Sequence, residues 1–237
     1  MTRCCIALRA CGRDANSLEA VADRIVRHLA DGMRDRDGAR QCALVRCFKT
    51  HPYGELDGKL QSFARDVLGG SPASPDTKCL TLLASAGERP EWNSRHTSAG
   101  HRALPLLDAE AVSRFPMIAA LVQELGVGIG ELLAPPEPIV IAGEPHAYSV
   151  FYVPDAAASP WIYAQEEFVI PFGIRSVIGF GGLLPDGELI ATLLFARVPV
   201  APETAQMFAT IALSVELAAL PHIEAQTFEK LGDVSRG

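Results

Sequence analysis

The sequence lacks the cysteine spacings with which proteins commonly bind metals or exchange electrons. Its six cysteines include no Cys-x-x-Cys pair, and Cys4 stands directly beside Cys5. Cys42 and Cys47 are five residues apart, which places them on opposite faces of a strand. We therefore expect buried free thiols that act as small apolar side chains, and neither a disulfide framework nor a cysteine-bound metal.

Long apolar runs and an excess of positive charge are also missing. We expect no run of the roughly 18–20 apolar residues that a transmembrane helix needs, and the N-terminus lacks the apolar region of a signal peptide. The net charge of −7 and the pI near 5.4 argue against general binding to nucleic acid or to anionic membranes. These absences predict a cytoplasmic protein with no nucleic-acid or membrane partner.

Common catalytic motifs are absent as well. The sequence has no Gly-x-Ser-x-Gly, no Gly-x-x-x-x-Gly-Lys and no His-Glu-x-x-His. The closely spaced glycines from Gly126 to Gly130 do not follow a predicted strand, so they indicate a break between helices rather than a nucleotide loop. The expectation is a protein that is not an enzyme and has no catalytic residues.

The closing part of the chain has the most regular pattern. Apolar residues at helical spacing predict a helix over Trp161–Phe172, and Gly173 follows where that helix would end. Two strands, Ile174–Leu184 and Glu188–Val198, are joined by Pro185-Asp186-Gly187, which is turn chemistry for a hairpin. A long amphipathic helix over Glu203–Leu220 then completes the stretch.

The opening part predicts a helix and a strand. Asn16 and Ser17 precede an amphipathic helix over Leu18–Leu29, and residues 1–14 before it form either a loose arm or a first short helix. Cys42–Thr50 is an apolar first strand. The middle is less regular, and its predicted elements are a helix over Asp57–Leu68, strands over Cys79–Ala84 and Ala103–Leu107, helices over Glu110–Leu125 and Ile129–Leu133, and strands over Ile139–Ala142 and Tyr148–Val153.

These end segments resemble a GAF domain. Gly173–Phe180 followed by Pro185–Phe195 is similar to the closing hairpin of such domains, and Glu203–Leu220 is similar to their last helix. Ser17–Leu29 and Cys42–Lys49 resemble their opening helix and first strand. The resemblance implies an α+β fold with a GAF/PAS-like central antiparallel sheet flanked by helices, and with a middle segment elaborated by helices and loops.

The same resemblance implies the domain organisation. It predicts one GAF-like domain over residues 15–222, with its elaboration at about residues 50–146, between an N-terminal arm (1–14) and a C-terminal tail (223–237).

Candidate ligand-binding residues cluster after the first strand and in the polar connection Ser85–His101. In a GAF architecture these segments fold over one face of the sheet and close a cavity, which needs apolar walls and a few placed polar groups. Aromatic area, cationic groups and imidazoles are all present there. The alternative is that these residues only tie a long loop to the sheet by hydrogen bonds. The six candidates are Lys49, His51, Tyr53, Trp92, Arg95 and His101.

Glu167 and Arg175 complete the candidate ligand site. Glu166 and Glu167 are adjacent carboxylates, but neighbouring helical positions point about 100° apart, so both seldom enter one pocket. Pairing of one glutamate with Arg175 is the structural interpretation that competes with a role in binding. A metal or haem site built from His51, Cys79, His96, His101 and the two glutamates is a further alternative, although nothing in their spacing demands one.

The resemblance implies a non-catalytic sensory or regulatory domain of the bacterial signal-transduction type. Such a domain binds a small molecule or a partner and signals through its terminal helices to a protein such as a histidine kinase or a cyclase. We expect a homodimer whose seam is Leu18–Leu29 with Phe208–Leu220, and an unidentified ligand or cofactor.

Two related activities fit the sequence less well. Free methionine-(R)-sulfoxide reductases with a GAF fold use cysteines of the C-terminal half, whereas no cysteine follows Cys79 here. Covalent bilin attachment usually has His after the linking cysteine, and the chain has no Cys-His dipeptide.

Overall fold

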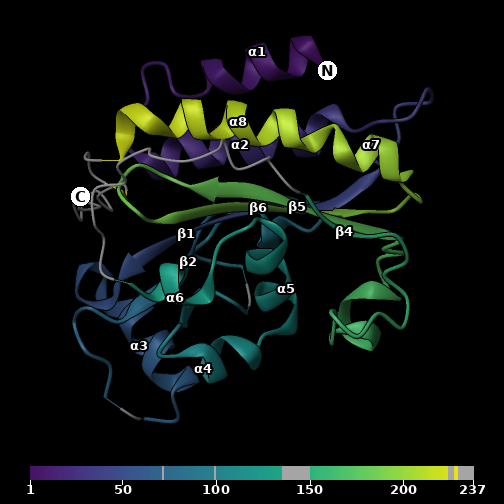
Figure 1. The fold of residues 1–237 in the computed structure, drawn as a ribbon. Coiled ribbons are helices and arrows are strands. Elements are labelled where there is room, and N and C mark those ends of the chain that lie inside the picture. The colour runs from purple at the N-terminus through teal and green to yellow at the C-terminus, as the bar shows by residue number, and fades with distance from the viewer. Residues whose placement is uncertain (71, 99, 135–149, 224–226, 229–237) are drawn as a thin grey trace, which may run out of the picture.

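A single antiparallel sheet lies between two layers of helices in the computed structural model of the protein (Figure 1). The structure describes residues 1–70, 72–98, 100–134, 150–223 and 227–228. Within these residues six strands are ordered β3-β2-β1-β6-β5-β4, and each neighbouring pair is antiparallel. The α+β class with a central antiparallel sheet flanked by helices, predicted from the sequence, is confirmed.

The pairing of β1 with β6 places the first and last long strands side by side in the middle of the sheet. The strand that begins at Cys42 and the closing hairpin therefore belong to one sheet, as the sequence predicts. The strands are β1 Cys42–Pro52, β2 Lys78–Gly87, β3 Ala103–Pro105, β4 Phe151–Val153, β5 Ser176–Leu183 and β6 Leu189–Ala196.

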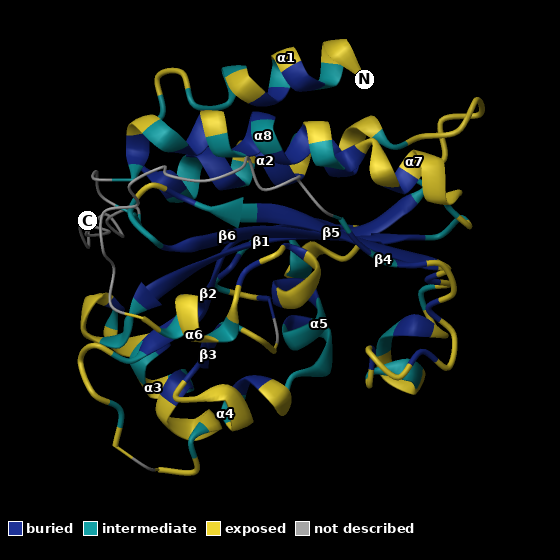
Figure 2. Cartoon of the chain, viewed as in Figure 1, coloured by how far each residue is buried: buried dark blue, intermediate teal, exposed yellow. Residues whose placement is uncertain are grey.

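Side chains of β1 alternate between the two faces of the sheet. Val45 and Cys47 belong to the core beneath the α1–α2–α8 layer, whereas Leu44 and Phe48 belong to the core on the opposite face. Both faces are covered, and Figure 2 shows the central strands in the buried colour between two layers with exposed outer surfaces. This explains why β6 is apolar at nearly every position and why the first four residues of β1, Cys42 to Val45, are apolar toward both faces.

Helices α2, α7 and α8 cover one face of the sheet, and α1 lies outside α8 (Figure 1). Ser17 caps α2 as predicted, because its hydroxyl accepts a hydrogen bond of 3.0 Å from the Ala20 amide. Residues 2–10 form a helix rather than a loose arm, and this helix packs on α8. The elements of this layer are α1 Thr2–Ala10, α2 Leu18–Gly32, α7 Pro202–Gln206 and α8 Phe208–Ala219, followed by a short 3₁₀ turn over Leu220–His222.

The opposite layer is built from short helices of the middle segment. The predicted helix over Glu110–Leu125 is divided in two, because Pro116 begins a new helix and Phe115 before it leaves the helical conformation. These helices are α3 Gly58–Val67, α4 Ala109–Ser113, α5 Pro116–Glu124 and α6 Ile129–Leu133. Short 3₁₀ turns occur at Tyr53–Glu55 and Pro90–Trp92.

The predicted helix over Trp161–Phe172 is wrong in extent. Only Gln165–Val169 is helical, as a short π-helix (η3). Before it, Trp161 lies in a turn and residues 162–164 have no regular secondary structure. The side chain of Gln165 explains this, because its amide donates to the carbonyls of Ala156 (3.0 Å) and Ile162 (2.8 Å) and holds a bent path. The apolar residues that suggested a helix are nevertheless packed against the sheet core, among them Ile162, Phe168 and Val169.

Other boundaries shift by a few residues. β2 continues three residues past the predicted end at Ala84, and its last residue, Gly87, lies close to β1: a Cβ there would be 2.8 Å from the Ala43 carbonyl oxygen. The predicted strand Ile139–Ala142 lies outside the described residues, and of Tyr148–Val153 the structure shows β4.

The predicted hairpin turn is confirmed and is fastened by buried charges. Gly187 has a φ of +74°, a left-handed conformation that glycine adopts without strain. Lys49 of β1 pairs with Asp186 of the turn at 3.1 Å, and Lys78 of β2 pairs with Glu188 at 3.4 Å. Glu188 also accepts a hydrogen bond from the Thr50 hydroxyl. The end of the hairpin is thereby tied to β1 and β2.

One helical run, Pro202–His222, is long and apolar enough to match a membrane span, with 21 residues and a mean hydropathy of 1.3. The sequence-based expectation that no stretch reaches this length is therefore wrong for these residues. In the structure the run crosses the sheet (Figure 1), and residues such as Ile211 and Val215 are buried in the core beneath it. These apolar residues are thus buried by packing on the sheet.

Shortening Phe180 to alanine should destabilise the sheet–helix core. Phe180 is fully buried on β5, and its ring lies 5.4 Å from that of Phe208 on α8. We expect Phe180→Ala to lower the free energy of unfolding by about 3–5 kcal/mol in chemical denaturation.

The matched control is Ile170→Ala, at a residue that is 66% exposed, where we expect a change within about 0.5 kcal/mol. A loss of less than about 1 kcal/mol for Phe180→Ala would contradict the packing described here.

Candidate functional site: a cavity on the sheet

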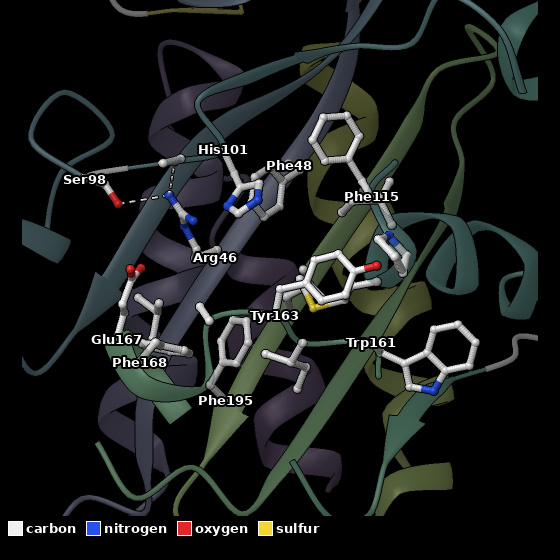
Figure 3. A pocket seen from close by; sticks show the side chains of 18 of the residues that line it. Arg46, Phe48, Ser98, His101, Phe115, Trp161, Tyr163, Glu167, Phe168 and Phe195 are labelled. Atoms are coloured by element: carbon white, nitrogen blue, oxygen red, sulfur yellow. Dashed lines mark hydrogen bonds between the residues drawn. The ribbon is translucent and has the colours of Figure 1, made fainter. Parts of the chain in front are cut away.

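A cavity of about 480 Å³ lies on the face of the sheet opposite α2 and α8 (Figure 3). Its floor comes from β1 and β6, and its walls come from three connections: residues 92–101, the α4–α5 junction at residues 114–118, and residues 161–168. This size suits a small organic molecule.

The β1–β6 register constructs the floor. Leu44 is opposite Phe195, and Arg46 is opposite Leu193, so every second residue of each strand faces the cavity. Phe48 completes the floor one step further along β1. Among these strand residues Arg46 is the one that carries a charge.

Arg46 places a cation inside this apolar surface. The residue is 8% exposed, and its Nη2 donates hydrogen bonds of 3.0 Å to the Ser98 hydroxyl and 3.0 Å to the Gly100 carbonyl. The guanidinium carbon lies 5.5 Å from the centre of the Phe48 ring. Burial lowers the pKa of Arg46 to about 10, so the group remains positively charged at neutral pH.

His101 is a second polar group of the cavity, and Figure 3 shows its ring near Phe48 and Arg46. Its pKa is lowered from the ordinary histidine value, first by desolvation of the ring and then by the positive charge of Arg46. His101 also has a φ of +47°, which is uncommon for a residue with a side chain. The imidazole therefore presents its neutral form at neutral pH.

Aromatic rings form most of the remaining wall. Phe168 meets the Trp92 ring at 5.6 Å and the Phe195 ring at 5.0 Å, both edge to face. Trp161 and Tyr163 stand at the rim and are 44% and 74% exposed. The two tryptophans of the sequence, Trp92 and Trp161, both line this cavity.

The eight residues predicted to bind a ligand do not share one cavity. Trp92, His101 and Glu167 line it. Arg175 is exposed, and Lys49 lies at the β5–β6 turn with Asp186. Neither Lys49 nor Arg175 therefore lines the cavity, although both lie close in sequence to residues that were expected there.

The remaining predicted residues, His51, Tyr53 and Arg95, gather elsewhere, around Phe228. His51 is five residues from Arg46, and an odd separation along a strand turns a side chain to the other face. His51 is buried, with 2% of its surface exposed, and Trp92 is partly buried. The two residues nevertheless belong to different sites.

Sequence reasoning missed Arg46 and several aromatic walls. The available signal was a lone arginine within a strand that is apolar on both sides, because a charge in such a strand is costly unless it has a role. The sequence around Phe115 and Tyr163 has no comparable feature. Whether these residues line the cavity depends on how loops that are distant in sequence meet over the sheet.

The six cysteines lie away from the cavity lining, and all are free thiols. Burial raises the pKa of Cys42, Cys47 and Cys79 to about 12, so these groups are protonated and weakly nucleophilic. Among the described residues, no group of three or more His, Cys, Asp or Glu side chains is arranged to hold a metal ion.

No protein-family model matches the chain, and no curated protein matches it. Among solved structures, the chain is similar to the phycoerythrobilin-bound GAF domain from a cyanobacterial phytochrome, with a TM-score of 0.45 and 12% identity over 93% of this chain and 97% of that chain. It is also similar to a bacteriophytochrome from the photosynthetic bacterium R. palustris, with a TM-score of 0.39 and 7% identity. That match covers 92% of this chain but 38% of the bacteriophytochrome chain.

Removing the charge of Arg46 should raise the pKa of His101. In Arg46→Gln the electrostatic contribution disappears while desolvation remains, so we expect the pKa to move upward and to stay below the ordinary histidine value. An NMR titration of the His101 ring measures it. Arg175→Gln, which removes an exposed charge outside the cavity lining, is the control and should leave the titration unchanged. An unaltered His101 titration in Arg46→Gln would show that the two groups do not interact.

Proposed function

We propose that the protein is a non-catalytic sensory domain that binds a small molecule in the sheet cavity. The observation that carries this proposal is a buried cation, Arg46, on the floor of a cavity whose walls are largely aromatic. A core built only for stability rarely contains a charge facing an open space of this size, because burying the charge is costly.

The chemistry of the lining favours a flat, largely apolar molecule with an anionic group. The rings of Trp92, Phe168 and Phe195 offer stacking and edge contacts to a planar body. The guanidinium of Arg46 is suited to a carboxylate, which it can bind through charge-assisted hydrogen bonds. His101 in its neutral form adds a donor or acceptor without adding charge.

The sheet offers a direct route from the cavity to the terminal helices. Arg46 faces the cavity, while Val45 and Cys47 on the same strand contact the layer of α2 and α8. A ligand that displaces β1 or β6 therefore changes the surface on which those helices pack. This supports signalling through the terminal helices to a partner such as a histidine kinase or a cyclase.

Dimerisation is part of the same proposal, with a changed seam. The inner sides of α2 and α8 are buried against the sheet, and α1 packs on α8, so the predicted seam of Leu18–Leu29 with Phe208–Leu220 is largely occupied. A dimer would instead use the outer surface of this helical layer, where Ile6, Met207 and Leu217 are exposed. A cytoplasmic location is also part of this proposal.

The observed site supports the two alternative functions less well. Reduction of methionine sulfoxide needs a reactive thiol beside the substrate, and the cysteines lie away from the cavity lining. A metal or haem sensor needs a ligand cluster, and two of the candidate ligands are far from forming one: His51 lies beside Phe228, whereas His101 lines the cavity.

Binding of an aromatic acid tests the proposed function. Phenylacetate and its uncharged counterpart phenylethanol are titrated into the protein while tryptophan emission is recorded, because both tryptophans line the cavity. We expect phenylacetate to change the emission and to bind more tightly than phenylethanol. Arg46→Gln should weaken phenylacetate binding by about tenfold or more and leave phenylethanol binding nearly unchanged.

Arg175→Gln is the matched control, since it removes an arginine that is exposed and outside the cavity lining. Arg46→Lys separates charge from geometry, because it retains the cation but loses the planar fork of donors. Native mass spectrometry of the freshly purified protein, with an absorption spectrum, identifies any natural ligand. Equal affinity for the acid and the alcohol, together with no co-purifying molecule, would refute the proposal.

A further inference from the structure

A second site lies apart from the cavity and holds Thr227 and Phe228. The ring of Phe228 lies 4.6 Å from the guanidinium carbon of Arg95 and 5.3 Å from the ring of His51. The same ring packs beside an apolar cluster that includes Leu60 and Cys79. We call the surface formed by His51, Arg95 and this cluster the Phe228 slot.

Two acidic residues hold the guanidinium of Arg95 in position beneath Phe228. It is 5% exposed, and its Nε pairs with the Glu19 carboxylate of α2 at 2.6 Å. Its Nη1 lies 3.7 Å from the carboxylate of Asp57, the residue that caps α3. With the guanidinium held by two carboxylates, its central carbon lies over the Phe228 ring, a cation–π contact that favours an aromatic side chain over an aliphatic one.

The backbone of the same segment contacts α2. The carbonyl of Thr227 accepts a hydrogen bond of 2.8 Å from the amide of Glu19. Glu19 occupies the first turn of α2, where an amide has no acceptor within the helix, and the next amide, Ala20, is capped by Ser17. Thr227 therefore satisfies a donor that the helix itself leaves open.

One loop connects this slot with the cavity. Trp92, Ser98 and His101 line the cavity, whereas Arg95, between them in sequence, forms the slot. Ser98 receives the hydrogen bond from Arg46, so the loop is held at one point by the cavity arginine and at another by the ion pairs of Arg95. A displacement of the loop at either site is transmitted to the other through only a few residues of chain.

From these contacts we infer that Phe228 is a latch, and that occupancy of the cavity controls whether Thr227 and Phe228 are docked in the Phe228 slot. A ligand that engages Arg46 changes its contact with Ser98, shifts the loop, and alters the position of Arg95 under the ring. The dependence on ligand rests on the function proposed above, whereas the latch and its link to the loop do not. By linkage, docking of Phe228 then changes the affinity of the cavity to the same degree.

Amide exchange at Glu19 tests the latch directly. Its protection depends on the Thr227 carbonyl, so we expect Phe228→Ala in the full chain to speed exchange of this amide by about tenfold or more, as measured residue by residue by NMR. The Ala20 amide, held by Ser17, is the internal control and should be unaffected. Phe228→Tyr retains the ring and should behave like the unmodified protein. An unchanged Glu19 exchange rate in Phe228→Ala would overturn the proposal.

The link to the cavity can be tested without any ligand. Ser98→Ala removes the contact with Arg46 on the cavity side, and we expect it also to speed exchange at Glu19. In the opposite direction, Phe228→Ala introduced into a Trp161→Phe protein should shift the emission of Trp92, the tryptophan that remains. If Phe228→Ala affects Glu19 while Ser98→Ala does not, and Trp92 emission is unchanged, the segment docks but the coupling is refuted.

A third experiment uses phenylacetate to test whether occupancy of the cavity controls the latch. We expect saturating phenylacetate to change the Glu19 exchange rate in the unmodified protein and to have no such effect in Phe228→Ala. If phenylacetate does not bind but the two ligand-free tests succeed, the latch stands and the proposed ligand class fails. If phenylacetate binds and leaves Glu19 exchange unchanged, the ligand site stands and control of the latch by occupancy fails.

Discussion

Antiparallel pairing of β1 with β6 is the interaction on which the rest of the structure depends. The two strands are separated by well over half of the chain, and their register places Arg46 opposite Leu193 and Leu44 opposite Phe195. One set of alternating side chains becomes the cavity floor, and the other set becomes the surface on which α2 and α8 pack. Because strand alternation has a period of two, a shift of one residue would turn Arg46 toward the helices and Val45 toward the cavity. Site and scaffold are thus fixed by the same register.

Two buried arginines hold the described residues of the loop, 92–98 and 100–101, in position. A loop of this composition has few apolar groups of its own, so its conformation must be held by other contacts. Arg46 supplies one from the strand, through Ser98 and the Gly100 carbonyl. Arg95 supplies the other from within the loop, through Glu19 and Asp57. A buried cation is stable only with such partners, and each arginine therefore fixes its surroundings as much as they fix the arginine.

The sequence predicts the regular elements well and the site only in part. The closing hairpin follows from Pro185-Asp186-Gly187, and the start of α2 follows from Ser17, because both signals act over a few residues. The helix expected at Trp161–Phe172 fails because the hydrogen bonds of one side chain, Gln165, outweigh an apolar spacing that suits a helix. Of the residues predicted to bind a ligand, Trp92, His101 and Glu167 line the cavity. Arg46 also lines it but was not predicted, because which face of β1 meets a cavity is not a local property.

The sequence by itself determined the α+β class, the order of the elements and the absence of common catalytic motifs. These depend on periodicity, turn chemistry and residue types, which are properties of short segments. The tertiary structure alone decided that the predicted site residues divide between a cavity and the Phe228 slot, and that Lys49 fastens a hairpin turn instead. Those outcomes depend on contacts between residues far apart in the chain, whose geometry is set by strand register and by the packing of loops over the sheet.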